Sequence, residues 1–223
     1  MPGQRSGLVT VADWNVISAL ATAAGTLVLA GASFASIRSA DRAALSAERA
    51  LQASLRPLLI TSRLEAPQQK LIWQGGHGAY LPGSAGYLRL TEDNLYLAAS
   101  IRNVGPGLGV IHGWRFAPPE TYQDVVHPDP ADFRRQARDL YVAPGDTSFW
   151  HAALRDPEDP YHRALVDPVK NGERVNIDLL YGDAEGGQRT ISRFSLIRVG
   201  PELEERWICQ VVRHWNLDRP DPR

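Results

Sequence analysis

Four side chains that could bind a metal ion or carry out acid–base chemistry lie in one proline-rich stretch: Asp124, His127, Asp129 and Asp132. Imidazole and carboxylate groups serve both as metal ligands and as general acids or bases. Metal ligands are usually held by a rigid scaffold, whereas an aspartate in a loop often caps the helix that follows. We therefore favour a solvated loop with helix-capping aspartates, and we keep an enzyme that uses residues 124–132 as the alternative.

A second group of carboxylates lies in the sequence GDAEGG, residues 182–187. Asp183 and Glu185 supply too few oxygen ligands for a calcium-binding loop of the EF-hand type. Glycine adopts the positive φ that tight turns need, so the stretch predicts a hairpin turn. An enzyme that uses residues 181–190 remains a further alternative. The glycines expected to set the turn geometry are Gly182, Gly186 and Gly187.

No other stretch of the sequence contains a known catalytic or cofactor motif. The glycine-rich sequence at 105–109 lacks the lysine of a phosphate-binding loop and the helix that follows a dinucleotide-binding loop. The six histidines include no pair at the i, i+4 spacing of a helical zinc site. The single cysteine, Cys209, lies in an apolar run and excludes a disulfide within the chain. We therefore expect no catalytic residue, no cofactor and no metal ion.

The charge of the chain is balanced, with 24 Lys and Arg residues against 25 Asp and Glu residues and a formal net charge of −1. Nucleic-acid-binding proteins usually have a basic excess, because neutralising phosphates supplies most of their affinity. We therefore expect no nucleic acid among the partners.

One pair of residues near the C-terminus could contact a partner. Most tryptophans and tyrosines fall in apolar runs and are expected in a core. His214 and Trp215 lie beside the polar tail, where an exposed aromatic ring would mark an interface. Together with Asp183 and Glu185 they form our candidate interaction patch. The alternative is that Trp215 belongs to the core like the other aromatic residues.

An apolar stretch without charge or proline at 16–37 is long enough to cross a membrane, and it follows a short tail at 1–15. A cleaved signal peptide and a buried soluble helix are the alternatives that we weigh less. More arginines follow the stretch than precede it, so the positive-inside rule predicts a cytoplasmic C-terminal domain on the inner (plasma) membrane. The arginines that follow it are Arg38, Arg42, Arg49 and Arg56.

The next segment, 38–56, is rich in helix-forming alanine, leucine, arginine and glutamate, and Pro57 should stop it. Small or apolar residues recur every three or four positions over 37–54. Such a seam is typical of helices that associate, so we predict either a homo-oligomer through this helix or packing of the seam on the domain or the membrane. The seam contains Ile37, Ala40, Ala44, Ala47, Leu51 and Ser54.

Residues 57–215 alternate short apolar runs with Gly, Pro, Asp and Asn turns. This pattern predicts a mainly β fold, an antiparallel immunoglobulin-like β-sandwich with short helical insertions at 130–138 and 159–170, and an extended tail at 216–223. A glycine-rich loop is expected at 74–86. The expected strands are 58–60, 70–73, 87–90, 95–101, 109–116, 140–142, 147–154, 175–181, 189–199 and 207–215.

The apolar span, the alanine- and arginine-rich helix, RPLLI at 56–60, RNVGPGLGVIHGWRF at 102–116 and LLYGDAEGGQRTISRF at 179–194 together resemble a group of uncharacterised actinobacterial single-pass membrane proteins. The resemblance covers most of the chain. It implies an immunoglobulin-like sandwich in the cytosol and a membrane anchor, and it implies no catalytic residue.

A complete-looking fold without catalytic motifs favours a membrane-anchored interaction or scaffolding module that binds an unknown protein partner. A small-ligand sensor with a pocket in the domain is one alternative. The other alternative is an enzyme that uses one of the two loops named above.

Overall fold

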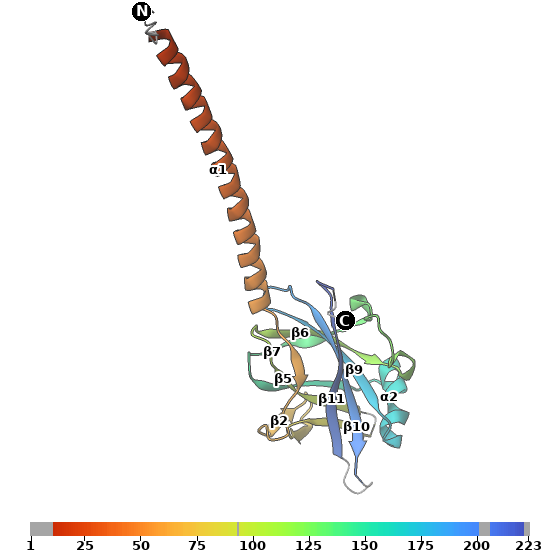
Figure 1. The fold of residues 1–223 in the computed structure, drawn as a ribbon. Coiled ribbons are helices and arrows are strands. Elements are labelled where there is room, and N and C mark those ends of the chain that lie inside the picture. The colour runs from red at the N-terminus through yellow and green to blue at the C-terminus, as the bar shows by residue number, and fades with distance from the viewer. Residues whose placement is uncertain (1–10, 93, 201–205, 221–223) are drawn as a thin grey trace, which may run out of the picture. The chain divides into compact units, whose positions relative to one another are not determined.

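The computed structural model describes residues 11–92, 94–200 and 206–220. The chain divides into two compact units, Met1–Leu51 and Gln52–Arg223. The first unit is helical and the second is built mainly from antiparallel β-strands (Figure 1). A mainly β domain that follows an N-terminal helix is therefore confirmed.

A single helix, α1, extends over Val11–Ser54 and contains 44 residues. Its alanine- and leucine-rich sequence favours helix throughout, so the predicted span and the predicted following helix form one element. The helix starts within the predicted tail 1–15, of which residues 1–10 lie outside the described part of the chain. It ends three residues before Pro57, which disfavours helical backbone at the residue that precedes it.

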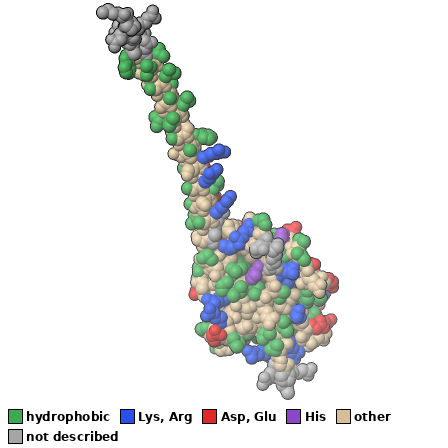
Figure 2. All heavy atoms as spheres, viewed as in Figure 1, with side chains coloured by type: hydrophobic (Ala, Val, Ile, Leu, Met, Phe, Trp, Pro, Cys, Tyr) green, Lys and Arg blue, Asp and Glu red, His purple; other side chains and the backbone are tan. Residues whose placement is uncertain are grey.

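The first part of α1 has the surface of a membrane-crossing segment. Its large side chains are apolar and exposed, as shown by Leu27 (74% exposed), Leu29 (70%) and Phe34 (64%). Figure 2 shows hydrophobic side chains along this part of the helix and basic side chains farther along it. The segment Trp14–Leu51 contains a stretch long and apolar enough to cross a membrane. These properties support membrane association.

Hydroxyl groups within this stretch bond to the helix's own backbone. Thr22 donates to the carbonyl of Ser18 and Thr26 donates to that of Thr22, both at 2.8 Å. A polar group without a partner is costly in hydrocarbon, so polar groups that enter a bilayer must be satisfied within the protein. These hydrogen bonds make the threonines compatible with lipid.

Most strands of the second unit fall where the apolar runs predict them, and long segments at 118–133 and 155–174 separate some of them. Two are short outer strands that form a hairpin, and the others belong to one large sheet. The strands are β1 Leu59–Thr61, β2 Gln69–Ile72, β3 Gly78–Leu81, β4 Ala85–Thr91, β5 Asn94–Asn103, β6 Gly109–Ala117, β7 Arg134–Val142, β8 Thr147–Leu154, β9 Val175–Gly182, β10 Thr190–Val199 and β11 Arg206–Asn216.

The large sheet has nine strands, in the order β1-β5-β4-β11-β10-β9-β6-β7, with β8 on the other edge of β5. Every strand pair in it is antiparallel. An immunoglobulin-like sandwich has two separate sheets, whereas these strands form one continuous hydrogen-bonded sheet. The immunoglobulin-like topology is therefore not confirmed.

The sheet curves around one apolar core, so strands from its two ends meet. The rings of Trp114 on β6 and Trp150 on β8 lie 5.2 Å apart, although β6 and β8 are near opposite ends of the strand order. Trp150 is fully buried, as are Phe194 and Leu196 on β10. Helix α2, Pro160–Asn171, adds Leu165 and other apolar side chains to this core.

Strand β5 is buried on both of its faces. Leu95, Leu97 and other alternate residues enter the main core, as their spacing predicts. The residues between them, Tyr96 and Ala98, enter a second cluster that the β2–β3 hairpin covers. The strand β3 in this hairpin lies inside the segment 74–86, which we predicted to be a loop.

The helix predicted at 130–138 is wrong. Pro130 begins only a single 3₁₀ turn, Pro130–Asp132, with the side chain of Asp129 as its cap. Phe133 is extended, and the chain then enters β7, where Arg134 and Arg135 pair with β6. Tertiary pairing with β6 therefore overrides the helix-forming composition of this stretch.

The helix predicted at 159–170 is confirmed as α2. Asp159 accepts a hydrogen bond from the backbone N–H of Tyr161 at 2.8 Å, which satisfies one of the free donors at the start of the helix. Gly172 ends the helix with φ +69°, a left-handed conformation in which glycine is favoured.

Arg56, the second residue after α1, is tied to two distant parts of the domain. Its Nε donates to the side-chain oxygen of Gln188 at 3.1 Å, in the turn between β9 and β10. Its Nη1 donates to the side chain of Asn216, the last residue of β11. The segment that enters the domain is thereby joined to the segment that leaves it.

Candidate functional site

Strands β7 and β8 follow each other in the chain but do not pair. A short turn at 143–146 connects them, and Gly145 in this turn has φ +81°. The turn is fastened to β5, because Gly145 donates to the carbonyl of Asn103 at 2.9 Å. From there β7 pairs with β6 while β8 pairs with β5, so the two strands diverge. In the part of the chain that the structure describes, each of them pairs with a single strand.

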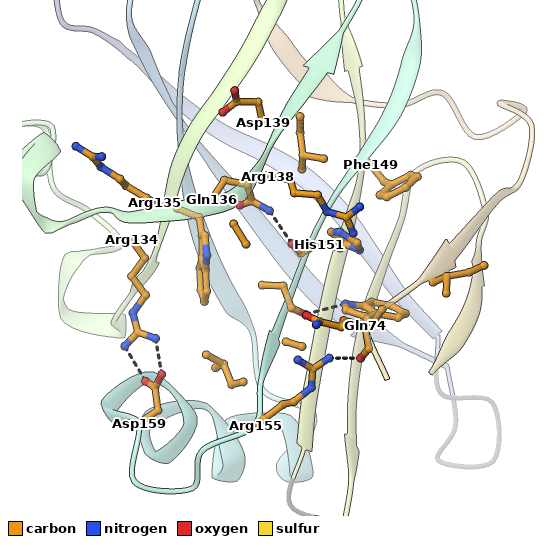
Figure 3. A pocket seen from close by; sticks show the side chains of 18 of the residues that line it. Gln74, Arg134, Arg135, Gln136, Arg138, Asp139, Phe149, His151, Arg155 and Asp159 are labelled. Carbon is orange, nitrogen blue, oxygen red and sulfur yellow. Dashed lines mark hydrogen bonds and ion pairs between the residues drawn. The ribbon is translucent and has the colours of Figure 1, made fainter. Parts of the chain in front are cut away.

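A cleft of about 830 Å³ lies between the diverging strands (Figure 3). Its walls are residues 134–140 of β7 and, from β8, Phe149 and residues 151–154. Residues 72–74, at the end of β2 and just after it, also line the cleft. This cleft brings together the unpaired edges of two strands. We take it as the candidate functional site.

A bulge in β7 shapes the cleft. Ile111 of β6 pairs with Leu140 and Gly113 pairs with Arg135, so His112 alone stands opposite four residues of β7. Those four residues, 136–139, have no register partner in β6. Bulges turn side chains out of their regular alternation and are frequent beside functional sites. Here the bulge contributes Gln136 and Arg138 to the lining of the cleft.

The side chain of Gln136 bridges the cleft. Its Nε2 donates to the carbonyl of His151 at 3.2 Å, and its Oε1 accepts from the indole N–H of Trp150 at 3.3 Å. A carboxamide has the same donor and acceptor groups as a peptide unit. The side chain of Gln136 therefore takes the place of one of the backbone hydrogen bonds that would join β7 to β8 if the two strands were paired. The main-chain carbonyl of His151 is directed toward β7.

The ring of His151 lies within the lining of the cleft. Its centroid is 5.6 Å from that of Trp73 and 5.4 Å from that of Phe149. Its Nδ1 is buried and has no hydrogen-bond partner among the residues that the structure describes. Burial of the ring, and then the nearby charge of Arg138, lower the pKa of His151 below its ordinary value of 6.5. The imidazole is therefore neutral at neutral pH.

Basic side chains outnumber acidic ones around the cleft. Arg134 is neutralised by Asp159, with hydrogen bonds of 2.5 and 2.7 Å, and this pairing lowers the pKa of Asp159. Arg155 donates to the main-chain carbonyl of Gln74 and contacts no carboxylate among the described residues. Figure 3 shows the side chain of Arg138 directed toward His151. The cleft therefore combines two strand edges that have no partner strand among the described residues with positive charge, an arrangement suited to binding.

The candidate interaction patch does not form as expected around Trp215. Its side chain is only 1% exposed, and its indole N–H donates to the carbonyl of Val125 at 2.8 Å. The guanidinium of Arg193 lies 5.0 Å from the ring. The expected exposure of Trp215 is therefore wrong, because the chain between β6 and β7 covers it. The interface role of His214 and Glu185 stays a prediction.

Asp183 is a structural residue of the hairpin turn. It is 5% exposed, and its Oδ1 accepts from the N–H groups of Glu185 at 3.0 Å and Gly187 at 2.8 Å. Of the three glycines expected to need positive φ, only Gly186 has it, with φ +80°. Gly182 is required for a different reason, because a Cβ there would lie 2.7 Å from the carbonyl oxygen of Gly187.

The residues of the 124–132 loop separate into structural roles. Asp129 caps the 3₁₀ turn by accepting from Ala131 at 2.9 Å, so the predicted capping role is confirmed for it. Asp132 lies 3.6 Å from Arg115, and Arg213 donates to the main-chain carbonyl of Asp124. Among the described residues, no three His, Cys, Asp or Glu side chains are grouped closely enough to hold a metal ion.

One serine–histidine contact is not visible in the sequence. Ser192 Oγ lies 2.6 Å from His214 Nδ1 and 2.7 Å from the hydroxyl of Tyr181. The partners come from three strands, and only the register that places Ser192 opposite His214 brings them together. Ser192 is fully buried, so no substrate can reach its hydroxyl. Burial of its own hydroxyl raises the pKa of Tyr181 to about 12, and the three residues form a hydrogen-bonded polar chain within the domain.

The cleft residues were missed for a physical reason. The stretch 134–139 has helix-forming composition, and the bulge removes the alternation that marks a strand. The one sequence signal was the apolar run at 140–142, which is the regular end of β7.

In comparisons with known proteins, the chain matches no protein-family model and no curated protein. The resemblance to actinobacterial single-pass membrane proteins therefore stays a prediction, and the function has to be argued from the cleft.

Proposed function

We propose that this protein is a membrane-anchored interaction module that captures an extended segment of a partner protein between β7 and β8. The observation that carries the proposal is that two consecutive strands pair with different neighbours and leave their other edges facing one cleft. A strand edge has free N–H and C=O groups at regular spacing, and an extended peptide can pair with them. A strand added here would continue the sheet from β7 to β8.

The bulge and the charges of the cleft determine how such a strand can enter. Bulges and charged side chains on an edge discourage pairing between whole sheets. Residues 136–139 combine both features. They therefore disfavour association between copies of the domain through this edge, while a single peptide strand can still enter the cleft.

The anchor defines where capture takes place. We propose that α1 crosses the inner (plasma) membrane with the β domain in the cytosol, in agreement with the arginines that follow the span. Self-association through the seam at 37–54 would place several clefts side by side and raise the avidity for a repeated ligand.

The test measures whether binding protects the two edges. Full-length protein in nanodiscs is used to select peptides from a displayed library of random extended sequences. Hydrogen exchange is then measured with and without a selected peptide. We expect slower exchange of amides in 134–142 and 147–154, because a new strand would bond to them. Binding that leaves both segments unchanged, or a selection that enriches no peptide over empty nanodiscs, would refute strand capture.

A matched pair of proline substitutions supports the test. Ala137→Pro places a residue without an N–H in the bulge and should abolish peptide binding. Ala184→Pro lies in the exposed β9–β10 turn, where Gly186 donates to the carbonyl of Asp183 at 3.2 Å and proline is favoured at the second position. It should bind as the unmodified protein does. The unfolding midpoint of each variant shows that both are folded.

A small-ligand sensor is the second candidate, because a cleft of about 830 Å³ falls within the size range of small-molecule sites. The same exchange experiment separates the two functions. A small ligand would protect side-chain-lined parts of the cleft without slowing exchange along both strands.

A further inference from the structure

Several cations around the cleft lack an acidic partner. Arg134 has Asp159, but Lys70, Arg135, Arg138 and Arg155 form no ion pair within residues 11–92, 94–200 and 206–220. A charge in a cleft that a ligand covers loses its hydration, and it then needs a counter-charge in the ligand. The unpaired cations therefore indicate the charge of the segment that the cleft accepts.

The other acidic side chains that line the cleft, Asp139 and Asp156, form hydrogen bonds with groups other than these cations. Asp139 accepts from the hydroxyl of Tyr141 at 3.2 Å, and Figure 3 shows its carboxylate pointing away from the centre of the cleft. Asp156 accepts from the backbone N–H of Glu158 at 2.9 Å, as part of the loop before α2. Neither acid compensates the guanidinium of Arg138.

The bulge in β7 places Arg138 in the lining of the cleft. The side chain of Arg138 is directed toward the ring of His151. The imidazole of His151 is neutral and its Nδ1 is buried, so the guanidinium of Arg138 is the charged group on that side of the cleft. A carboxylate at this point could accept two hydrogen bonds from the guanidinium.

We propose that the captured segment is acidic and that one of its Asp or Glu carboxylates binds the guanidinium of Arg138 beside His151. This inference rests on the proposed strand capture. The adjacent main-chain edges favour a carboxylate carried on a peptide, because an isolated anion would leave those N–H and C=O groups without a partner. The binding preference at this position is therefore set by one residue in the bulge.

Three synthetic pools of nine-residue peptides test the inference. Every pool is random except at its central residue, which is Glu, Gln or Lys. Full-length protein in zwitterionic nanodiscs is mixed with each pool, and the retained fraction is measured against empty nanodiscs. We expect the Glu pool to be retained about tenfold more than the Gln pool, because a charge-assisted hydrogen bond replaces a neutral one. The Lys pool should be retained least.

Two arginine variants locate the effect. Arg138→Gln should reduce retention of the Glu pool to that of the Gln pool and leave retention of the Gln pool unchanged, which also shows that the variant is folded. Arg135→Gln is the matched control, because Arg135 also lines the cleft from β7, but Figure 3 shows its side chain directed away from His151 and Arg138. It should keep the tenfold preference.

The outcomes separate this inference from the function on which it rests. Equal retention of the Glu and Gln pools, with slower exchange along β7 and β8, overturns the acidic preference and leaves strand capture standing. A preference that survives Arg138→Gln overturns the assignment to Arg138. Retention of no pool, or retention without protection of either strand, overturns both proposals.

Discussion

Asp178 on β9 and Arg193 on β10 form a two-pronged ion pair that is almost completely buried. The two hydrogen bonds measure 2.7 Å and 2.9 Å, and the side chains are 0% and 2% exposed. Arg115 approaches the same carboxylate at 3.4 Å. Arg193 also donates to the main-chain carbonyl of Thr121. One carboxylate therefore neutralises two guanidinium groups and, through Arg193, helps to hold the chain between β6 and β7 on the sheet.

Removing this carboxylate should destabilise the domain strongly. Asp178→Asn leaves the buried guanidinium of Arg193 without a counter-charge, while Arg115 keeps only the exposed Asp132 at 3.6 Å. We therefore expect a loss of about 3–5 kcal/mol in the free energy of unfolding. This loss is measured by unfolding the full-length protein with urea in detergent while tryptophan fluorescence is recorded. Glu158→Gln is the control, because its ion pair with Arg163 is exposed and should contribute less than about 1 kcal/mol. Equal losses for the two variants would contradict the assignment.

The bridge made by Gln136 should contribute to stability. Gln136→Ala leaves the buried indole N–H of Trp150 without its acceptor, and we expect a loss of about 1–3 kcal/mol. The same unfolding measurement applies. Gln74→Ala is a suitable control, because the contact of Gln74 with Arg155 uses its main-chain carbonyl and survives the change. A Gln136→Ala variant as stable as this control would show that water replaces the bridge.

The thiol of Cys209 should be unreactive in the folded protein. Burial raises its pKa to about 12, so neither thiolate nor access is available near pH 8. We expect no labelling by a maleimide until urea unfolds the domain. An Asp139→Cys variant, in which the added thiol is exposed, should label at once and serves as the positive control. Rapid labelling of the unmodified protein would mean that β11 opens locally.

His151 should make stability depend on pH. Its pKa is lowered by burial and by Arg138, so the unfolded chain takes up the proton first as pH falls below 6.5. The stabilising contribution of the neutral ring is complete above that pH and is lost as pH falls toward the folded-state pKa. The charged or titratable groups around the ring are Arg138 and, across Trp73, His77. His151→Phe keeps the packing and removes this titration, so its unfolding free energy should fall less between about pH 7.5 and pH 5.5. Parallel pH curves would contradict the prediction.

The orientation of the domain can be measured directly. A protease added to spheroplasts should leave a C-terminal tag intact if the domain is cytosolic, as the arginines after the span predict. Lysis before the addition is the control that shows the tag to be cleavable. Cleavage in intact spheroplasts would place the domain outside the membrane, and its partners would then be sought there.

The sequence predicts helices and strands well where the apolar residues follow one regular spacing or form one long run. In β5 the alternation of Leu95 and Leu97 with Tyr96 corresponds to two real faces, and the long apolar stretch of α1 is a helix as expected. Prediction failed at 130–138 because a bulge in β7 and its pairing with β6 are decided by contacts distant in the chain.

The same reason explains the errors at the candidate sites. In the sequence Trp215 lies beside a polar tail, which suggests exposure. In the structure Val125, 90 residues away in the chain, covers it and accepts the hydrogen bond of its indole. The cleft itself exists because β7 pairs with β6 while β8 pairs with β5. This difference in pairing is set by contacts between distant segments and not by the local sequence of either strand.

The attachment of Arg56 has a mechanical consequence. A pull on the chain at Leu55 does not load β1 alone, because Arg56 passes part of the force to Gln188 and Asn216. The load is therefore shared between the start of the domain, the β9–β10 turn and the end of β11. A tether built in this way resists being peeled off one short strand, and tension along it reaches the central strands of the sheet.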